Sequence, residues 1–169
     1  MSATIFSAVQ TARAFMQDAY RARGNDSGSA AIEHSLAVAR LLQEDGQPDT
    51  VVLAGLLHDV LEDTDVTPAE LRQRFGPEIT RLVEAMTQDP AIAGYERRKG
   101  ALRQQILAAG SQAATIALAD KTAKLQSEAE RPNERRLAHY RATLAGIEQR
   151  FGPSPLSKRL HKELASFSG

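Results

Sequence analysis

Residues 51–64 read Val-Val-Leu-Ala-Gly-Leu-Leu-His-Asp-Val-Leu-Glu-Asp-Thr, an apolar run followed by a polar cluster. From Asp49 or Thr50 onward the run is apolar on most sides, which is typical of a helix buried at the centre of a helical protein. The apolar run ends at two adjacent polar residues, His58 and Asp59. The stretch therefore predicts a central helix that ends at a His-Asp pair.

Helical periodicity continues on both sides of this stretch, and alternating β-branched or aromatic runs are scarce. Thr67, Pro68 and Glu70 form a clear helix start, with a capping threonine, a proline at the first position and a glutamate three residues after the cap. The pattern predicts a single all-α domain. Helices are expected at 5 to about 23, 32–42, 49–58, 67–76 and 77–86. Further helices are expected to include 102–106 and end at 110, to run from 112 to about 128, to include 137–147, and to follow 155.

Composition supports one globular domain over residues 1–169. Hydrophobic residues make up 42% of the chain and charged residues 25%, and 21 basic residues balance 21 acidic ones. Zero net charge does not predict a nucleic-acid partner, although a local basic pocket stays open. The chain has no cysteine, so any metal must be held by His, Asp or Glu.

The location of the protein is expected to be cytoplasmic. The N-terminal residues do not have the basic region and apolar run of a signal peptide. No stretch of about 18 apolar residues predicts a membrane span. The sequence does not fix the oligomeric state, so a homodimer remains open.

Four polar residues interrupt apolar helical surroundings: His34, His58, Asp59 and Asp120. Two imidazoles and two carboxylates form a mixed nitrogen and oxygen set that suits a divalent transition metal. A carboxylate inside the apolar run at 116–119 is costly unless it is paired, hydrogen-bonded or bound to a cation. The four residues therefore predict a metal site between packed helices.

Glu62 and Asp63 follow the His-Asp pair by about one turn. The i to i+4 spacing places Glu62 above His58 and Asp63 above Asp59. A carboxylate so placed can orient or deprotonate a water activated by the metal.

Each residue also has a structural interpretation. Asp120 can serve as an interior ion-pair partner of Lys121, Lys124 or an arginine. Glu62, Asp63 and Asp65 can form a solvated acidic helix end. The joint occurrence of these residues in chain order favours the metal site.

The motifs resemble the HD superfamily, and more narrowly the hydrolase domain of the RelA/SpoT homologues. The stretch 32–39 (IEHSLAVA) is similar to the family's YINHPLAVA, 54–64 (AGLLHDVLEDT) to AALLHDVVEDT, and 118–121 (LADK) to the start of LADKLHNL. The likeness covers roughly residues 4 to 150. It implies a compact HD-domain bundle of about eight to ten helices, here a hydrolase-only chain because no synthetase module follows Gly169.

The resemblance also implies roles for individual residues. A manganese ion is expected on His34, His58, Asp59 and Asp120, and the acid pair that handles the attacking water is expected at Glu62 and Asp63. The implied activity is hydrolysis of the 3′-pyrophosphate of (p)ppGpp or its adenosine analogue (p)ppApp. Substrate contacts are expected at Arg23, Lys121, Lys124, Arg136 and Tyr140.

Departures from the family motifs concern the substrate pocket. Gly24 replaces a lysine, Ala30 and Ala31 replace a proline and a tyrosine, and Lys124 replaces an asparagine. They leave open the base of the nucleotide. They also leave open an HD nucleotidase acting on a nucleoside monophosphate or NADPH, and a catalytically silent nucleotide-binding domain.

Three further features favour ordinary surface roles. Arg and Lys within residues 96–99 suit a phosphate clamp, but the solvated face of a helix is the favoured interpretation. His139 and His161 lie in polar helical surroundings and are expected at the surface.

Overall fold

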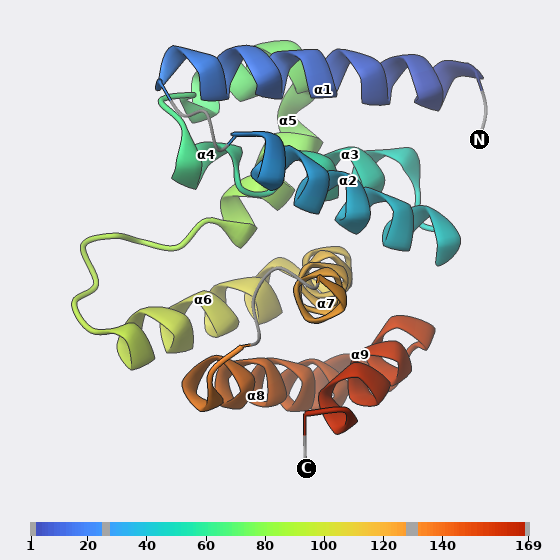
Figure 1. Cartoon of the computed structure of the whole chain (residues 1–169), viewed down its shortest axis with the longest axis vertical. Helices are drawn as coiled ribbons and strands as arrows, with labels where there is room; N and C mark the ends of the chain where they lie inside the picture. The colour runs from blue at the N-terminus through green and yellow to red at the C-terminus, as the bar shows by residue number, and fades with distance from the viewer. Residues whose placement is uncertain (1–2, 25–27, 128–131, 168–169) are drawn as a thin grey trace.

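The structure, a computed structural model, describes residues 3–24, 28–127 and 132–167. Within these ranges the chain forms helices and no strand, which confirms the all-α prediction (Figure 1). The helices are α1 (Ala3–Ala22), α2 (Gly28–Glu44), α3 (Asp49–Leu57), α4 (Val60–Asp63), α5 (Pro68–Met86), α6 (Tyr95–Ala109), α7 (Ser111–Gln126), α8 (Glu134–Phe151) and α9 (Pro155–Ala165).

The helices are arranged in two groups that meet at α7. Helices α1 to α5 occupy one half of the molecule in Figure 1, and α6 to α9 occupy the other, with α7 seen end-on between them. Helix α7 packs against α2 and α3 of the first group and against α6, α8 and α9 of the second. Side chains carried by α7 can therefore face both groups.

Helix α3 is the buried helix that its sequence predicted. Val51, Val52 and Ala54 to Leu57 are all buried, and the helix packs against α1, α2, α5 and α7. A helix that is apolar on all sides gains most of its stability from such tertiary packing. The burial of α3 fixes the position of the His-Asp pair that follows it.

The structure confirms the sequence signals for the start of α5 and for a break within it. The Thr67 hydroxyl accepts from the backbone N–H of Glu70, and the Glu70 carboxylate accepts from the backbone N–H of Thr67, which completes the capping box. At Gly76, φ is 85°, a left-handed conformation that favours glycine, and Pro77 follows. The predicted break between 67–76 and 77–86 is therefore present as a kink within α5.

Helices α6, α7, α8 and α9 lie where the sequence expects them. Gly110, with φ of 107°, separates α6 from α7. The expected end of a helix at about 128 lies outside the described residues.

Gly55 permits the close approach of α2 and α3. A Cβ atom at this position would lie 2.2 Å from Leu42 Cδ1 and 3.3 Å from Val38 Cγ1, and both neighbours are fully buried. We expect Gly55→Ala to lower the free energy of unfolding by about 1–3 kcal/mol, because a packed core resists added volume. Urea unfolding measures this change.

A matched control is Gly100→Ala in α6. A Cβ there would meet only Arg103 Nη2, at 3.7 Å. This variant is expected to gain up to about 1 kcal/mol from helix propensity. Equal effects of the two substitutions would contradict a packing role for Gly55.

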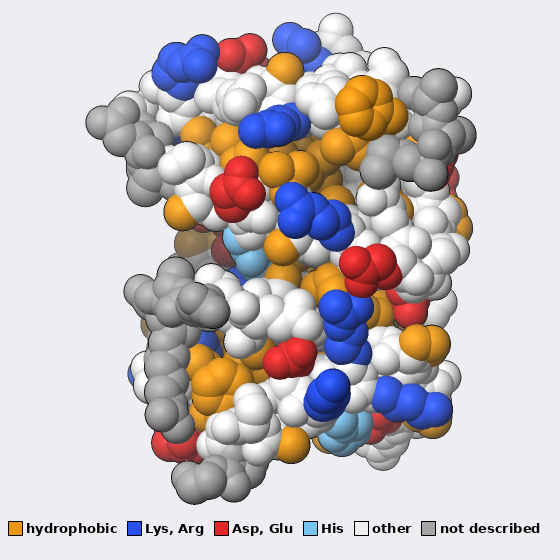
Figure 2. All heavy atoms as spheres, turned by 45° about the vertical axis from the view of Figure 1, so that its right-hand side comes forward, with side chains coloured by type: hydrophobic (Ala, Val, Ile, Leu, Met, Phe, Trp, Pro, Cys, Tyr) orange, Lys and Arg blue, Asp and Glu red, His pale blue; other side chains and the backbone are white. Residues whose placement is uncertain are grey.

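The surface mixes charges of both signs. Figure 2 shows Lys and Arg side chains interspersed with Asp and Glu over one face, and a histidine visible in a recess of that face. Among the described helices, none has both the length and the apolar character needed to cross a bilayer.

Candidate metal centre and adjoining pocket

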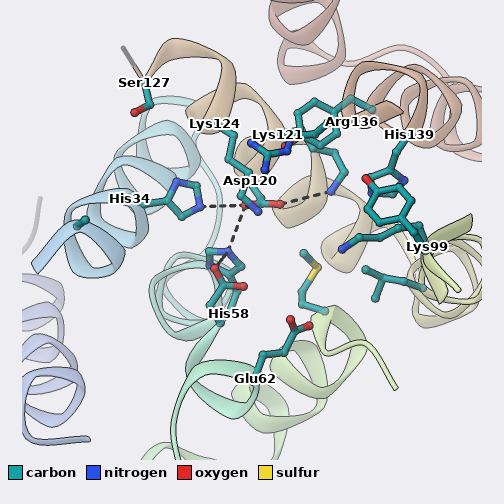
Figure 3. A pocket seen from close by; sticks show the side chains of 16 residues that line it. His34, His58, Glu62, Lys99, Asp120, Lys121, Lys124, Ser127, Arg136 and His139 are labelled. Carbon is teal, nitrogen blue, oxygen red and sulfur yellow. Dashed lines mark hydrogen bonds and ion pairs between the residues drawn. The ribbon is translucent and has the colours of Figure 1, made fainter. Parts of the chain in front are cut away.

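Three predicted ligands from distant parts of the chain meet at one point. His34 Nε2 lies 2.9 Å from Asp120 Oδ1, and His58 Nε2 lies 3.3 Å from the same oxygen (Figure 3). The potential ligand atoms of His34, His58 and Asp120 all lie within 4.8 Å of one another. These three side chains can therefore bind one divalent metal ion.

His58 has the tautomer that a metal ligand needs. Its Nδ1 lies 2.7 Å from the carbonyl oxygen of Gly55, which can only accept, so Nδ1 carries a proton. Its Nε2 is buried and has no partner with hydrogen-bond geometry, although carboxylates surround it. A backbone carbonyl that fixes Nδ1–H and directs Nε2 at an ion is the usual outer support of a histidine ligand.

Charge around His58 also fits a cation. Burial lowers the pKa of His58, but the carboxylates of Asp59 and Asp120 outweigh burial and raise it to about 10. The lone pair of Nε2 is thus held next to two negative charges that need a proton or a metal ion to balance them. The residues present therefore fit a divalent cation.

Asp59 lies beside this cluster. Its Oδ2 is 3.1 Å from His58 Nε2, and its side chain is 27% exposed. Although burial opposes the shift, His58 holds the pKa of Asp59 well below its usual range. Asp59 is therefore ionised beside the cluster of His34, His58 and Asp120. An ionised carboxylate is what a fourth ligand of a metal at this cluster would need.

The predicted helix is interrupted at the His-Asp pair, but Asp63 still lies one turn beyond Asp59, because its backbone N–H donates to the Asp59 carbonyl at 3.0 Å. Helix α3 ends at Leu57 and α4 begins at Val60, and the chain turns at His58 and Asp59. The central helix therefore stops before the pair.

Glu62 contacts the loop that follows α5, and Asp63 contacts α1. The Glu62 carboxylate accepts from the backbone N–H of Gln88 at 2.7 Å and from its side-chain amide at 3.1 Å. The Asp63 carboxylate accepts from the Tyr20 hydroxyl at 3.1 Å. Burial, followed by the charge of Asp59, raises the pKa of Asp63, and burial also raises the pKa of Glu62.

A cavity of about 450 Å³ opens from the cluster toward α6 and α8. His34, His58, Asp59 and Asp120 all line it, and so does Glu62, whereas Asp63 is not among the lining residues. Lysine and arginine side chains line the same cavity, so it combines an acidic and histidine-rich part with a cationic part. The cationic residues are Lys99, Lys121, Lys124 and Arg136.

Asp120 belongs to both parts. Lys124 Nζ lies 2.9 Å from its Oδ1, and Lys121 Nζ lies 3.3 Å from its Oδ2. The interior ion pair expected as the structural alternative is therefore present together with the histidine contacts. Lys121 is buried, which lowers its pKa, and its Nζ lies 5.7 Å from the centre of the Tyr140 ring.

Four of the five expected substrate contacts line the cavity: Lys121, Lys124, Arg136 and Tyr140. Arg23 follows the end of α1, is exposed, and is not among the lining residues. The structure thus gathers the contacts from α7 and α8 and leaves Arg23 apart.

The solvated-face interpretation of residues 96–99 is wrong for Lys99. Lys99 lines the cavity and donates to the Gln88 side-chain carbonyl at 3.0 Å. Arg97 and Arg98 donate to the backbone carbonyls of Ala93 and Ile92, so they hold the preceding loop.

The surface location expected for His139 is also wrong. His139 is 6% exposed because α8 packs it between the rings of Tyr95 and Tyr140. Arg136, His139 and Tyr140 have the i, i+3, i+4 spacing of one helix face, a signal that identifies His139 as a lining residue. The same expectation is confirmed for His161, which is exposed and pairs with Glu148.

Comparison with known proteins places this architecture in a family. The model of the HD domain matches residues 12–145, and the chain therefore belongs to the HD domain family. This confirms the resemblance that the sequence motifs indicated.

Among similar proteins is the mouse guanosine-3′,5′-bis(diphosphate) 3′-pyrophosphohydrolase MESH1. It is 43% identical over 84 residues, which are 48% of this chain and 47% of the mouse protein. The guanosine-3′,5′-bis(diphosphate) 3′-pyrophosphohydrolase of Aquifex aeolicus is 34% identical over 110 residues, 65% of this chain and 16% of that protein. The matched part thus spans about half or less of these relatives.

Solved structures agree on the fold. The lmo0812 protein of Listeria monocytogenes EGD-e has a TM-score of 0.70 at 27% identity, with 79% of this chain and 92% of that chain covered. A metazoan SpoT ortholog, described as hydrolysing ppGpp, has a TM-score of 0.72 at 24% identity, with 99% and 97% covered.

Proposed function

We propose that residues 1–169 form one HD-type enzyme unit that hydrolyses the 3′-pyrophosphate of an alarmone nucleotide, (p)ppGpp or (p)ppApp, with Mn²⁺ as cofactor. The observation that carries this proposal is the single cavity in which a His34-His58-Asp120 cluster adjoins a set of lysine and arginine side chains. A divalent cation and a polyphosphate are the ligands that such a cavity suits.

The names of the relatives support the substrate class. Proteins similar to this chain in mouse and Aquifex aeolicus are named as 3′-pyrophosphohydrolases of guanosine-3′,5′-bis(diphosphate). In the proposed reaction a water oxygen bonds to the 3′ phosphorus and the P–O3′ bond breaks. The O3′ oxygen takes up a proton, so that pyrophosphate and a nucleotide with a free 3′-hydroxyl are released.

In this proposal His34, His58, Asp59 and Asp120 hold the Mn²⁺ ion. When bound, it supplies Lewis-acid polarisation of a phosphate oxygen and acidifies water. The Nδ1–H group of His58 donates to the Gly55 carbonyl, so the imidazole orientation is fixed throughout. Asp120 is held from its other side by Lys121 and Lys124.

Glu62 is the group proposed to take the proton of the attacking water. It lines the cavity, and two hydrogen bonds from Gln88 fix its carboxylate. A carboxylate whose pKa is raised by burial is a better proton acceptor near neutral pH than an exposed one. Asp63 accepts a hydrogen bond from Tyr20 and does not line the cavity. We propose that its negative charge assists proton transfer to Glu62.

The opposite wall is proposed to bind the phosphates. Lys99, Lys121, Lys124 and Arg136 offset the charge that develops on phosphate oxygens. Tyr140 places an aromatic ring beside Lys121.

A competition assay tests the proposed function. The manganese-loaded protein is incubated with ppGpp, ppApp, NADPH and a nucleoside monophosphate, and anion exchange resolves the products. We expect pyrophosphate from ppGpp or ppApp and its loss in a Glu62→Gln, Asp63→Asn variant. Release of inorganic phosphate alone, or no turnover, would contradict the proposal and favour a nucleotidase or a binding domain.

A further inference from the structure

His139 lines the cationic part of the cavity, whereas the metal cluster lies in the acidic and histidine-rich part. It comes from α8, and Tyr95 of α6 and its own neighbour Tyr140 flank its ring, with ring centres at 6.4 Å and 5.7 Å. Figure 3 shows His139 and Lys99 on the opposite side of Asp120 from His34. No role for this side chain follows from the metal site.

The contact with Arg103 fixes the tautomer of His139. Arg103 Nη1 lies 3.0 Å from His139 Nδ1. A guanidinium can only donate, so Nδ1 must be the acceptor, and the proton of the neutral ring must be on Nε2. Arg103 thus makes His139 a donor at its other nitrogen.

The surrounding charges keep this ring neutral. Burial, followed by the positive charges of Lys121, Lys99 and Arg103, lowers the pKa of His139 to about 3. A buried imidazole among cations would be poorly placed as a base, but its Nε2–H remains a donor at any ordinary pH.

The Nε2–H group has no protein acceptor in the described part of the chain: its ring makes one hydrogen bond there, through Nδ1. A donor that lines a cavity beside Lys99 and Lys121 is suited to an anionic acceptor with several oxygens. A neutral nucleobase carbonyl would gain little from the positive charge of this wall, whereas an anionic phosphate group would be attracted to it.

We propose that Nε2–H of neutral His139 donates a hydrogen bond to a non-bridging phosphate oxygen of the substrate, and that Arg103 positions His139 by holding Nδ1 as the acceptor. The phosphate is one bound on the α6 and α8 side of Asp120, away from His34. This inference deepens the proposed function and rests on it for the identity of the phosphate-bearing substrate.

Binding of inorganic pyrophosphate tests the contact without turnover. Long-range ¹H–¹⁵N spectra of the ¹⁵N-histidine-labelled protein report the tautomer of each ring. We expect His139 to be protonated at Nε2 only, and its Nε2 signal to shift with pyrophosphate but not with guanosine, while the signal of exposed His161 stays unchanged. Protonation at Nδ1, or a shift with guanosine alone, would overturn the proposal.

Kinetics of matched variants supply the second test. In His139→Phe the ring remains and the donor is lost, so KM for the alarmone is expected to rise about ten- to a hundredfold, the range for a hydrogen bond to a charged group, with a smaller change in kcat. His139→Gln, whose amide nitrogen can donate, should retain most of the affinity. Equal KM values for wild type and His139→Phe would overturn the contact.

The two tests separate this inference from the proposed function. If the wild-type protein hydrolyses no alarmone, the proposed function fails, and the pyrophosphate titration still decides whether His139 contacts phosphate. If hydrolysis occurs and His139 does not respond to pyrophosphate, the contact fails alone.

Discussion

Substitution of His58 by glutamine is expected to lower kcat/KM for the alarmone by more than about a hundredfold, because even outer partners of metal ligands are worth about ten- to a hundredfold. The variant loses the Nε2 lone pair that Asp59 and Asp120 surround. Metal analysis after gel filtration in dilute Mn²⁺ should show less than one ion per chain retained, in parallel with the loss of turnover.

Two other histidines provide the controls. His34→Gln alters a less buried member of the proposed ligand set, with 18% of the side chain exposed, and is expected to lose metal with little loss of folding stability. His161→Gln changes an exposed histidine that pairs with Glu148 and should retain both metal and activity. Full metal content in both His34→Gln and His58→Gln would refute the proposed ligand set.

Asp120→Asn is expected to destabilise the metal-free protein by about 3–5 kcal/mol, because removal of one partner leaves buried charge without compensation. Asp120 lies within ion-pair distance of Lys121 and Lys124 as well as of both histidines. Lys121 is buried and cannot regain water without local opening. Urea unfolding in the presence of EDTA measures the change in the free energy of unfolding.

The double variant Asp120→Asn, Lys121→Met tests the cause. If the uncompensated charge of Lys121 is responsible, the added substitution should restore a large part of the lost stability. If the free energy of unfolding of Asp120→Asn alone lies within about 1 kcal/mol of the wild-type value, the buried charges are balanced without Asp120.

Much of the fold could be predicted from local signals. The apolar character of 51–57 identified α3, the capping box at Thr67 identified the start of α5, and Gly76 with Pro77 identified its kink. Such signals depend on neighbouring residues alone. The break after Leu57 has no comparable signal in the sequence, because neither glycine nor proline stands at residues 58 and 59.

The candidate site was predictable where polar residues interrupt apolar helices. His34, His58 and Asp120 stand out for this reason, and the structure brings them together. Lys99 and His139 do not stand out, because their helices carry many polar residues, and the crossing of α6 and α8 decides which of them face inward. Gln88, which fixes Glu62, lies in a loop whose position depends on tertiary packing.

The contact between His34 and Asp120 joins residues 86 positions apart in the chain. Closure of so long a loop carries an entropic cost that must be met before the contact forms. The cluster is therefore a non-local feature of the fold, and nothing shorter than the segment from α2 through α7 contains all of it. The metal site is thus complete only when these helices are packed together.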